Sequence, residues 1–242
     1  MRLTDFKVLT FDCYGTLIDW ESGIMQALEP LVARASRPLT RNEVLEAHAR
    51  HESSQQAVTP AKRYSELLAV VHKRLAEDWG VAASCDECMA YGRSIRDWPA
   101  FPDSAEVLRY LKQHYKLVIL SNVDNESFAS SREKLGVDFD AVFTAEDIGS
   151  YKPALRNFEY MLEKLAGRGI GAEAILHTAE SLYHDHAPAN EFDLASCWIH
   201  RRHAEGGFGA TIDPGKTPHT DFRFTSMAEM MAAHRDVLEV PT

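Results

Sequence analysis

The sequence predicts an α/β fold in which a parallel sheet is interrupted once by a helical insertion. Three observations lead to this prediction. An apolar run near the amino terminus leads into an aspartate and a tight glycine turn, short β-prone runs alternate with helical segments from Pro102 onward, and the stretch between them has helical spacing only. Such alternation is typical of βαβ units, whose strands lie parallel in one sheet.

The first strand is predicted at residues 8–11, where an apolar run is followed at once by Asp12. Gly15 and Thr16 form the loop that leaves its carboxyl end, which is where open α/β sheets bind ligands. Asp12 is therefore a candidate nucleophile. The alternative is an aspartate that caps a helix or lies solvated in a loop, the commoner role of a lone aspartate after a strand.

Residues 18–98 are predicted to be helical, because apolar side chains recur at three- and four-residue intervals and no strand pattern is present. This spacing is carried by Ile24, Leu28, Leu31 and Val32 in one segment and by Leu67, Leu68, Val71 and Leu75 in another. Cys85 and Cys88 also fall in a helical pattern. No second cysteine pair accompanies them, which speaks against a metal or redox site.

The second half of the chain is predicted to alternate strands with helices. The predicted strands are residues 117–120, 141–145, 174–178 and 195–199. Asp103 and Glu106 have the spacing of a capping box before one helix, and Ser226 and Glu229 have the same spacing before the last helix. The glycine-rich stretch 206–218 is predicted to be a surface loop.

Composition and charge limit the partners of this chain. Its 242 residues are enough for a substantial apolar core, and its formal net charge is −10. That charge argues against nucleic acid and anionic membranes, which need a basic face, and favours a small-molecule partner. Four scattered cysteines, with no signal peptide or long apolar stretch, indicate a reducing cytoplasm.

Four short motifs follow one another along the chain. They are Asp12-x-Tyr14-Gly15-Thr16, the strand that ends in Ser121-Asn122, the tripeptide Tyr151-Lys152-Pro153, and residues 175–185 with their closing acids. In kind and order they resemble the motifs of the haloacid dehalogenase (HAD) superfamily, from about residue 6 to about residue 202. The resemblance implies a Rossmann-like core formed by residues 1–18 and 99–242, with residues 19–98 as a helical cap that closes over the active site.

Tyr14 indicates which branch of the superfamily the chain resembles. Phosphatases of the superfamily carry a second aspartate at this position, which protonates the leaving alkoxide. A tyrosine is neutral at pH 7 and a poor acid for that step, and its ring narrows the phosphate pocket. The resemblance is therefore to the dehalogenases, in which the nucleophile, here Asp12, attacks C2 of a small 2-substituted carboxylate and water hydrolyses the ester. A core aromatic at a turn is the alternative role for Tyr14.

The resemblance gives other motif residues roles around a negatively charged nucleophile and substrate. Lys152 offsets the repulsion and holds Asp12 ionised. Thr16, Ser121 and Asn122 offer donors to the substrate carboxylate and to the oxyanion formed during ester hydrolysis. Apart from the resemblance, Lys152 would be an exposed loop lysine, and a serine and asparagine after a strand would cap the next helix.

The fourth motif departs from the best-known dehalogenase pattern. Leu182 takes the place of an asparagine, and Glu180 is an additional acid. Asp185 resembles the last acid of the motif, which positions Lys152 or the hydrolytic water. Glu180 and Asp185 also have the spacing of the magnesium-binding acids of the phosphatases, which leaves a bound Mg²⁺ as an alternative. With Tyr14 in place we expect no cofactor.

Segments 9–20 and 177–186 resemble, more closely, the hydrolases of L-azetidine-2-carboxylate, dehalogenase relatives that open a strained four-membered imino acid to 4-amino-2-hydroxybutanoate. A halide leaves without a proton, whereas a ring amine stays protonated as it leaves and needs acceptors nearby. The candidate substrate-binding residues are Cys13, Tyr14, Trp20, Glu180 and His184.

Further histidines and acids could also serve the amine. His177 and His186 lie in the fourth motif, and His48, His51 and Glu52 lie on a predicted cap helix. For the cap residues, an exposed helix face is the alternative, because charged side chains usually mark such a face.

The sequence thus predicts a cytoplasmic, cofactor-independent hydrolase that attacks C2 of a small carboxylate through Asp12. Azetidine ring opening is favoured over the halide release of an (S)-2-haloacid dehalogenase. A magnesium-dependent phosphatase and a binding module without turnover are the remaining alternatives. The resemblance also implies a homodimer, because relatives often pair.

Overall fold

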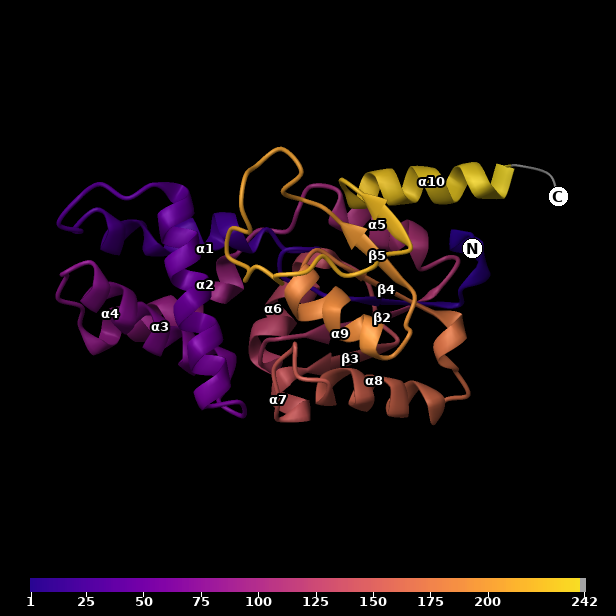
Figure 1. Cartoon of the computed structure of the whole chain (residues 1–242), viewed down its shortest axis with the longest axis horizontal. Helices are drawn as coiled ribbons and strands as arrows, with labels where there is room; N and C mark the ends of the chain where they lie inside the picture. The colour runs from indigo at the N-terminus through magenta and orange to yellow at the C-terminus, as the bar shows by residue number, and fades with distance from the viewer. Residues whose placement is uncertain (240–242) are drawn as a thin grey trace.

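The computed structural model describes residues 1–239 and contains a six-stranded sheet in which every pair of neighbouring strands is parallel. The strand order is β3-β2-β1-β4-β5-β6 (Figure 1). The strands are β1 (Val8–Phe11), β2 (Lys116–Ser121), β3 (Ala141–Thr144), β4 (Ile175–Ala179), β5 (Ser196–Ile199) and β6 (Phe222–Phe224). The predicted α/β class with a parallel sheet is confirmed.

Five of the six strands were predicted, each to within a residue or two at its ends. The edge strand β6 was not predicted. It has three residues, none of them fully buried, so neither an apolar run nor a clear alternation marks it in the sequence. The loop predicted at residues 206–218 is confirmed, since this stretch carries no helix or strand.

Helices cover both faces of the sheet (Figure 1). Leu117 and Ile119 of β2 face one apolar cluster, whereas Val118 and Leu120 face the other, as the two-residue period of a strand requires. The first cluster is completed by α5 (Ser104–Leu111), α6 (Asn125–Leu135) and α10 (Met227–Glu239), and the second by α8 (Arg156–Ala166) and α9 (Ala187–Glu191). The short helix α7 (Ala145–Ile148) follows β3.

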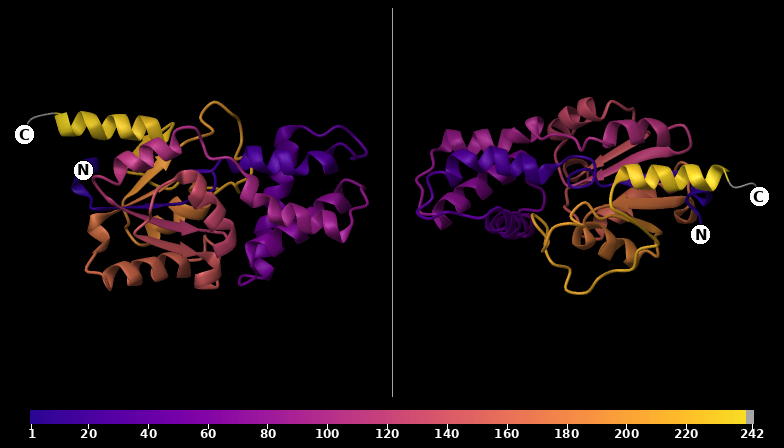
Figure 2. Two further views of the ribbon diagram at one scale, coloured as in Figure 1. Left: turned by 180° about the vertical axis from the view of Figure 1, so that it is seen from behind. Right: turned by 90° about the horizontal axis from the view of Figure 1, so that it is seen from above.

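Four helices between β1 and α5 lie together beside the sheet (Figures 1 and 2). They are α1 (Trp20–Val32), α2 (Arg41–Val58), α3 (Tyr64–Asp78) and α4 (Cys85–Arg93). The apolar positions that predicted helices here are mostly buried, and both cysteines of the Cys-x-x-Cys stretch lie in α4, unpaired. The chain leaves and returns side by side, because the Asp19 N–H donates to the Pro99 carbonyl over 2.8 Å. We refer to α1–α4 as the helical layer.

The two predicted capping boxes have different outcomes. Ser226 caps α10 by accepting from the Glu229 N–H over 3.0 Å, although the Glu229 carboxylate reaches back to Thr225. The prediction for Asp103 is wrong, because its side chain makes no cap bond and instead forms a two-point ion pair with Arg201. A guanidinium is a stronger partner for a carboxylate than a backbone N–H.

Among the described residues, no helix has both the length and the apolar character needed to cross a membrane.

Candidate active site

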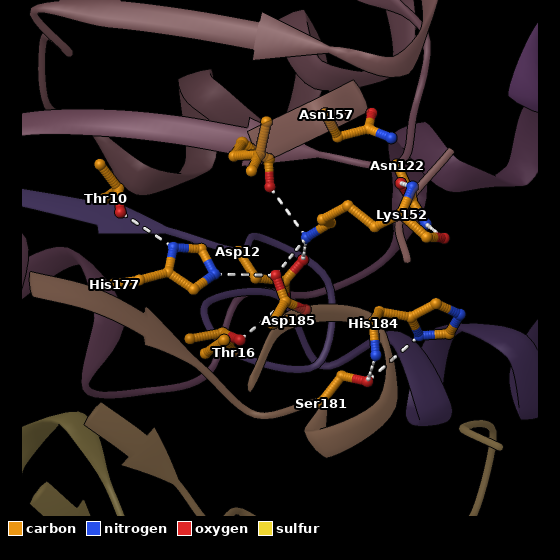
Figure 3. A network of polar contacts seen from close by, with 12 residues as sticks. Thr10, Asp12, Thr16, Asn122, Lys152, Asn157, His177, Ser181, His184 and Asp185 are labelled. Atoms are coloured by element: carbon orange, nitrogen blue, oxygen red, sulfur yellow. Dashed lines mark hydrogen bonds and ion pairs between the residues drawn. The ribbon is translucent and has the colours of Figure 1, made fainter. Parts of the chain in front are cut away.

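The predicted reactive side chains meet at the carboxyl end of the central strands (Figure 3). Asp12 directly follows β1, Asn122 directly follows β2, and Asp185 lies in a π-helical turn, Leu182–His186, shortly after β4. Strand β1 pairs with both β2 and β4, so the sheet changes its winding direction here. In open α/β sheets this switch point is where ligands bind.

Lys152 links two buried carboxylates. Its Nζ lies 2.9 Å from Oδ1 of Asp12, 2.6 Å from Oδ1 of Asp185 and 3.0 Å from the carbonyl oxygen of Leu120. These partners use all three donors of the ammonium, and the side chain is only 1 % exposed. The alternative of an exposed loop lysine is therefore excluded, and the cation is fixed between the two acids.

The acids differ in their protonation behaviour. Burial raises the pKa of Asp12, and the Lys152 charge only partly offsets this. Burial also acts to raise the pKa of Asp185, but the Lys152 charge and the hydrogen bond from His177 outweigh it, so its pKa lies below the ordinary value. For Lys152, burial is outweighed by the two carboxylates, and its pKa is raised. Asp185 is therefore the firmly ionised acid, and Asp12 is the more basic and more reactive one.

Thr16 holds the second oxygen of Asp12. Its hydroxyl donates to Oδ2 over 2.7 Å and accepts from the backbone N–H of Glu180 over 2.9 Å. Gly15 permits this loop, since its φ is +96° and a Cβ there would lie 3.1 Å from the indole nitrogen of Trp20. Each Asp12 oxygen thus has one defined donor, which fixes the orientation of the carboxylate.

Asn122 fixes the backbone of Lys152 instead of pointing a free amide at a ligand. Its Nδ2 donates to the Lys152 carbonyl over 3.0 Å, and its Oδ1 accepts from the Lys152 N–H over 2.7 Å. The Ser121 hydroxyl is buried without a partner among the described residues, and it is not among the side chains that line the cavity described below. Neither residue caps the next helix, since Asp124 does that.

His177 lies in β4 and positions Asp185 through a hydrogen bond. Its Nε2 donates to Oδ1 of Asp185 over 2.9 Å, and its Nδ1 lies 2.9 Å from the hydroxyl of Thr10 on the neighbouring strand (Figure 3). The ring is fully buried in β4. His177 therefore does not reach a ligand as an amine acceptor but positions a carboxylate, a role that its central place in a strand could have suggested. Oδ2 of Asp185 is buried and has no partner among residues 1–239.

A cavity of about 30 Å³ lies above the two acids. It is lined by Asp12, Tyr14, Trp20, Glu52, Tyr64, Asn122, Val123, Lys152, Ser181, His184, Asp185 and Thr211. Core and helical layer both contribute to the lining of this chamber, which lies where the two meet.

Tyr14 lines the cavity with its ring and turns its hydroxyl away from Asp12. The hydroxyl lies 2.7 Å from Oγ of Ser131, and the ring meets Trp98 edge to face. Burial raises the pKa of Tyr14 well above its usual range. At neutral pH the Tyr14 phenol is uncharged and keeps its proton. Since its hydroxyl contacts Ser131, it does not protonate a leaving group at C2.

His184 is a neutral donor in this cavity. Burial lowers its pKa to about 4. Ser181 Oγ accepts from the His184 backbone N–H over 3.0 Å and lies 3.1 Å from Nδ1, so its hydroxyl proton is free to point at Nδ1. The ring proton then sits on Nε2, a tautomer assigned from this network. That nitrogen suits an anionic group better than an ammonium.

Glu52 and Tyr64 reach the same cavity from the helical layer, on α2 and α3. Glu52 is 5 % exposed and Tyr64 3 % exposed, so the alternative of an exposed helix face is wrong for Glu52. It is also wrong for His48, which is fully buried, whereas His51 lies at the surface side of α2 and bonds to Asp78. Tyr64 was missed by the sequence analysis, because an isolated helical tyrosine carries no signal beyond core packing.

Two predicted substrate-binding residues do not line this cavity. The side chain of Cys13 is buried in the apolar core, where burial raises its pKa well above the usual range. Glu180 lines a neighbouring cavity of about 140 Å³ with Arg41, Arg201 and other side chains. Thr16 accepts a hydrogen bond from the Glu180 N–H, and the Glu180 side chain lies in the neighbouring cavity.

Trp20 and Thr211 line both cavities. Burial, together with the charges of Glu21 and Asp12, raises the pKa of Glu180 to about 8. His186 is buried with Nε2 against the Ala179 carbonyl over 3.0 Å and is not part of either lining. The fourth motif therefore places one acid, Asp185, at the nucleophile.

The residues present do not fit a magnesium site. A Mg²⁺ ion needs convergent carboxylate or carbonyl oxygens. Here Glu180 and Asp185 line different cavities, Oδ1 of Asp185 already binds Lys152 and His177, and position 14 is a neutral phenol. Within residues 1–239, no group of three or more His, Cys, Asp or Glu side chains could hold a metal ion.

Comparisons with known proteins agree with this architecture. Residues 6–177 match the haloacid dehalogenase-like hydrolases. The chain is 26 % identical over 218 residues to (S)-2-haloacid dehalogenase 4A of Burkholderia cepacia, an alignment that covers 81 % of this chain and 84 % of that protein.

Solved structures with the same fold include the defluorinating L-2-haloacid dehalogenase Rha0230, with a TM-score of 0.76 at 19 % identity over 97 % of this chain and 99 % of that chain. Another is the L-2-haloacid dehalogenase of Xanthobacter autotrophicus with chloropropionic acid covalently bound, with a TM-score of 0.76 at 17 % identity over 98 % of this chain and 100 % of that chain.

Proposed function

We propose, starting from the fact that this chain belongs to the haloacid dehalogenase-like hydrolases, that it hydrolyses small 2-substituted carboxylates through an ester on Asp12. The favoured substrate is L-azetidine-2-carboxylate, which would open to 4-amino-2-hydroxybutanoate. The observation that carries the reaction type is the Lys152-centred pair of carboxylates beneath a cavity in which position 14 is a tyrosine.

In the first step an oxygen of Asp12 attacks C2 of the substrate. The C2–O bond forms, the bond from C2 to the leaving atom breaks, and the electron pair leaves with that atom. Lys152 offsets the repulsion between the two negative charges that meet. The fixed orientation of the Asp12 carboxylate holds the attacking oxygen toward the cavity, which reduces the entropic part of the barrier.

In the second step water attacks the carboxyl carbon of the Asp12 ester. The bond from that carbon to the oxygen now attached to C2 breaks. Asp12 regains a carboxylate that contains the water oxygen, and the product leaves as a 2-hydroxy acid with the former Asp12 oxygen. Oδ2 of Asp185 is a buried acceptor without a partner among the described residues, so it is suited to orient the water by accepting a hydrogen bond from it. One displacement at C2 inverts its configuration.

The polarity of the cavity supports an amine as the leaving group. Glu52 and the hydroxyl of Tyr64 present oxygen acceptors in the same small chamber as Asp12, which supports a leaving amine. A departing halide would add a further negative charge beside these oxygens. The relationship to (S)-2-haloacid dehalogenase 4A nevertheless favours halide release as the second candidate activity.

A phosphatase is disfavoured by the geometry of position 14. That reaction needs an acid two residues after the nucleophile, and the Tyr14 hydroxyl is directed at Ser131 with its pKa raised.

The test is a panel of L-azetidine-2-carboxylate, (S)-2-chloropropanoate and p-nitrophenyl phosphate, scored separately for amino alcohol, chloride and phosphate. Single-turnover reactions in ¹⁸O-water identify the step. We expect the heavy oxygen to appear first in Asp12 and not in the product. Product that is labelled in the first turnover would rule out the ester mechanism.

A further inference from the structure

Glu52 is a buried carboxylate in the helical layer that faces the nucleophile. It lines the Asp12 cavity, it is 5 % exposed, and it lies on α2, outside the four sheet motifs. The attack of Asp12 on C2 does not require it. A buried carboxylate that the chemistry does not use needs a reason, because removing its charge from water is costly.

The neighbours of Glu52 donate hydrogen bonds to only one of its two oxygens, and both donors are neutral. Oε1 accepts from the Tyr64 hydroxyl over 2.7 Å and from Nε2 of Gln56 over 3.3 Å. Oε2 accepts no hydrogen bond from the described residues, and Nδ1 of His48 lies 3.8 Å away. Burial lowers the pKa of His48 to about 3, so this imidazole is neutral and does not compensate the charge.

The lysine in the cavity is not available to Glu52. All three donors of Lys152 are used by Asp12, Asp185 and the Leu120 carbonyl. The carboxylate in the helical layer therefore lacks the cation that the carboxylates in the sheet possess. Burial without such a cation raises the pKa of Glu52 to about 7.

We propose that Glu52, oriented by the Tyr64 hydroxyl, is the specificity-determining residue that binds a cationic nitrogen attached to C2 of the substrate. This inference rests on the proposed attack of Asp12 at C2. A small zwitterion fits the charge pattern of the chamber: its ammonium pairs with Glu52, and C2 lies between Glu52 and Asp12.

The proton balance of ring opening agrees with this placement. The ring nitrogen arrives as a secondary ammonium with two protons, takes the electron pair of the C2–N bond, and becomes a neutral primary amine. Hydrolysis of the ester releases one proton, and the amine takes it up to end as an ammonium. Glu52 accepts hydrogen bonds from the nitrogen throughout, and its carboxylate can carry that proton between the two steps.

Several titratable groups face Glu52 and take part in its pH response. They are His48 on α2, Tyr64 on α3, Tyr91 on α4, Tyr151 beside the lysine, and Asp12, Lys152, His184 and Asp185 on the sheet side. The tyrosines have raised pKa values, and burial keeps His48 and His184 neutral above about pH 4. Among these groups, Glu52 is thus the one in the helical layer that changes charge near neutral pH.

The experiment compares Glu52→Gln with the wild type on L-azetidine-2-carboxylate and on (S)-2-chloropropanoate. Glutamine keeps the shape and removes the charge. We expect kcat/KM for ring opening to fall by about 100-fold, the scale of losing one partner of a buried charge pair. Chloride release should stay within about threefold of wild type or rise. The pH profile adds a second readout: the rise in ring-opening kcat/KM through about pH 7 should vanish in the variant.

Glu66→Gln is the matched control, because it makes the same change at an exposed position of the helical layer. It should leave both reactions unchanged. Tyr64→Phe, which removes the donor to Oε1, should lower ring opening by less than Glu52→Gln. Equal losses on both substrates in Glu52→Gln would reduce Glu52 to a structural residue and overturn the proposal, as would unchanged ring opening.

Binding without turnover separates this inference from the proposed function. Calorimetry with wild type and Glu52→Gln uses L-azetidine-2-carboxylate and cyclobutanecarboxylate, an isostere without nitrogen. A wild-type preference for the cation that disappears in the variant supports Glu52 as the cation site even if no ring opens. Ring opening by the wild type with the same preference in both proteins would leave the function standing and overturn the role of Glu52.

Discussion

The two sides of the chamber treat buried carboxylates differently. On the sheet side, Asp12 and Asp185 share one lysine and receive further hydrogen bonds from Thr16 and His177. On the helical side, Glu52 has neutral donors and no cation among the described residues. The sheet side is complete before a substrate binds, whereas the helical side lacks one positive charge.

This difference separates reactivity from selectivity. A fixed cation between two acids lets a nucleophile act without rearrangement, which is the basis of electrostatic preorganisation. An acid without a cation on the opposite wall binds a cationic ligand more tightly, and it disfavours a substrate that releases an anion beside it. Changes on the sheet side should therefore affect all substrates equally, and changes on the helical side should discriminate between them.

The largest expected effect is that of Asp12→Asn. An amide is a far weaker nucleophile, so turnover of every substrate should fall by about 10⁴-fold or more, as in other enzymes that lose a covalent nucleophile. Initial rates of amine alcohol and chloride formation measure the effect. Asp86→Asn, an exposed charge change on α4, serves as the control. Retained turnover of either substrate would show that Asp12 is not the nucleophile and that the sheet side does not carry the reactivity.

The second effect is that of Lys152→Met. Two buried acids then lose their shared cation, and we expect a loss of about 3–5 kcal/mol in the free energy of unfolding at pH 7, with activity abolished on both substrates. Urea denaturation measures this, with exposed Lys73→Met as control.

The pH dependence of that loss has a defined sign. The pKa of Asp185 is lowered in the folded protein, so its contribution is present above about pH 4 and is lost as the pH falls through the folded value. The pKa of Lys152 is raised, so its contribution is full below about pH 10 and is lost as the pH rises through its folded value. The stability gap between wild type and Lys152→Met should thus narrow at both extremes. A gap that is constant with pH would show that the lysine acts by packing alone.

The sheet side was largely predictable from the sequence. A nucleophile after a buried strand, a hydroxyl residue in the following loop and a lysine before a proline are local patterns, and their convergence follows from parallel strands whose carboxyl ends share one edge. Asp12, Thr16, Lys152 and Asp185 therefore meet as expected. The role of His177 was missed, because strand burial and cross-strand pairing decide which way its ring points.

The helical side was much less predictable. Helical periodicity predicts that α2 and α3 form, but not which residues face the sheet, because this depends on how two helices pack. Glu52 and His48 look alike in a list of polar residues on one helix, yet Glu52 lines the chamber and His48 lies outside its lining. Cys13 and Glu180 show the converse: sequence proximity to a motif did not bring their side chains to the nucleophile.

A third prediction tests whether His177 acts through Asp185. His177→Phe keeps an aromatic ring against Phe158 and removes the donor to Asp185. Losing a hydrogen bond to a charged group costs about 1.5–3 kcal/mol, so kcat should fall by about 10–100-fold with KM little changed. Without that donor the pKa of Asp185 rises, and the acid limb of the kcat profile should move to higher pH. His177→Asn, which retains a donor, should recover part of the loss, and a pure stability defect would leave the pH profile unmoved.

The smallest expected effect belongs to the residue at the border of the two sides, Tyr14. Its hydroxyl lies 2.7 Å from Oγ of Ser131, donates to the Ser127 carbonyl over 3.3 Å and makes no bond to Asp12, so Tyr14→Phe removes these two contacts and leaves the ring in place. We expect unfolding to become easier by about 1 kcal/mol, with ring opening and chloride release both within about threefold of wild type. Thermal melts and the two initial rates check this. A large and selective loss of ring opening would give the phenol a role in holding the leaving amine, and selectivity would then no longer rest on the helical side alone.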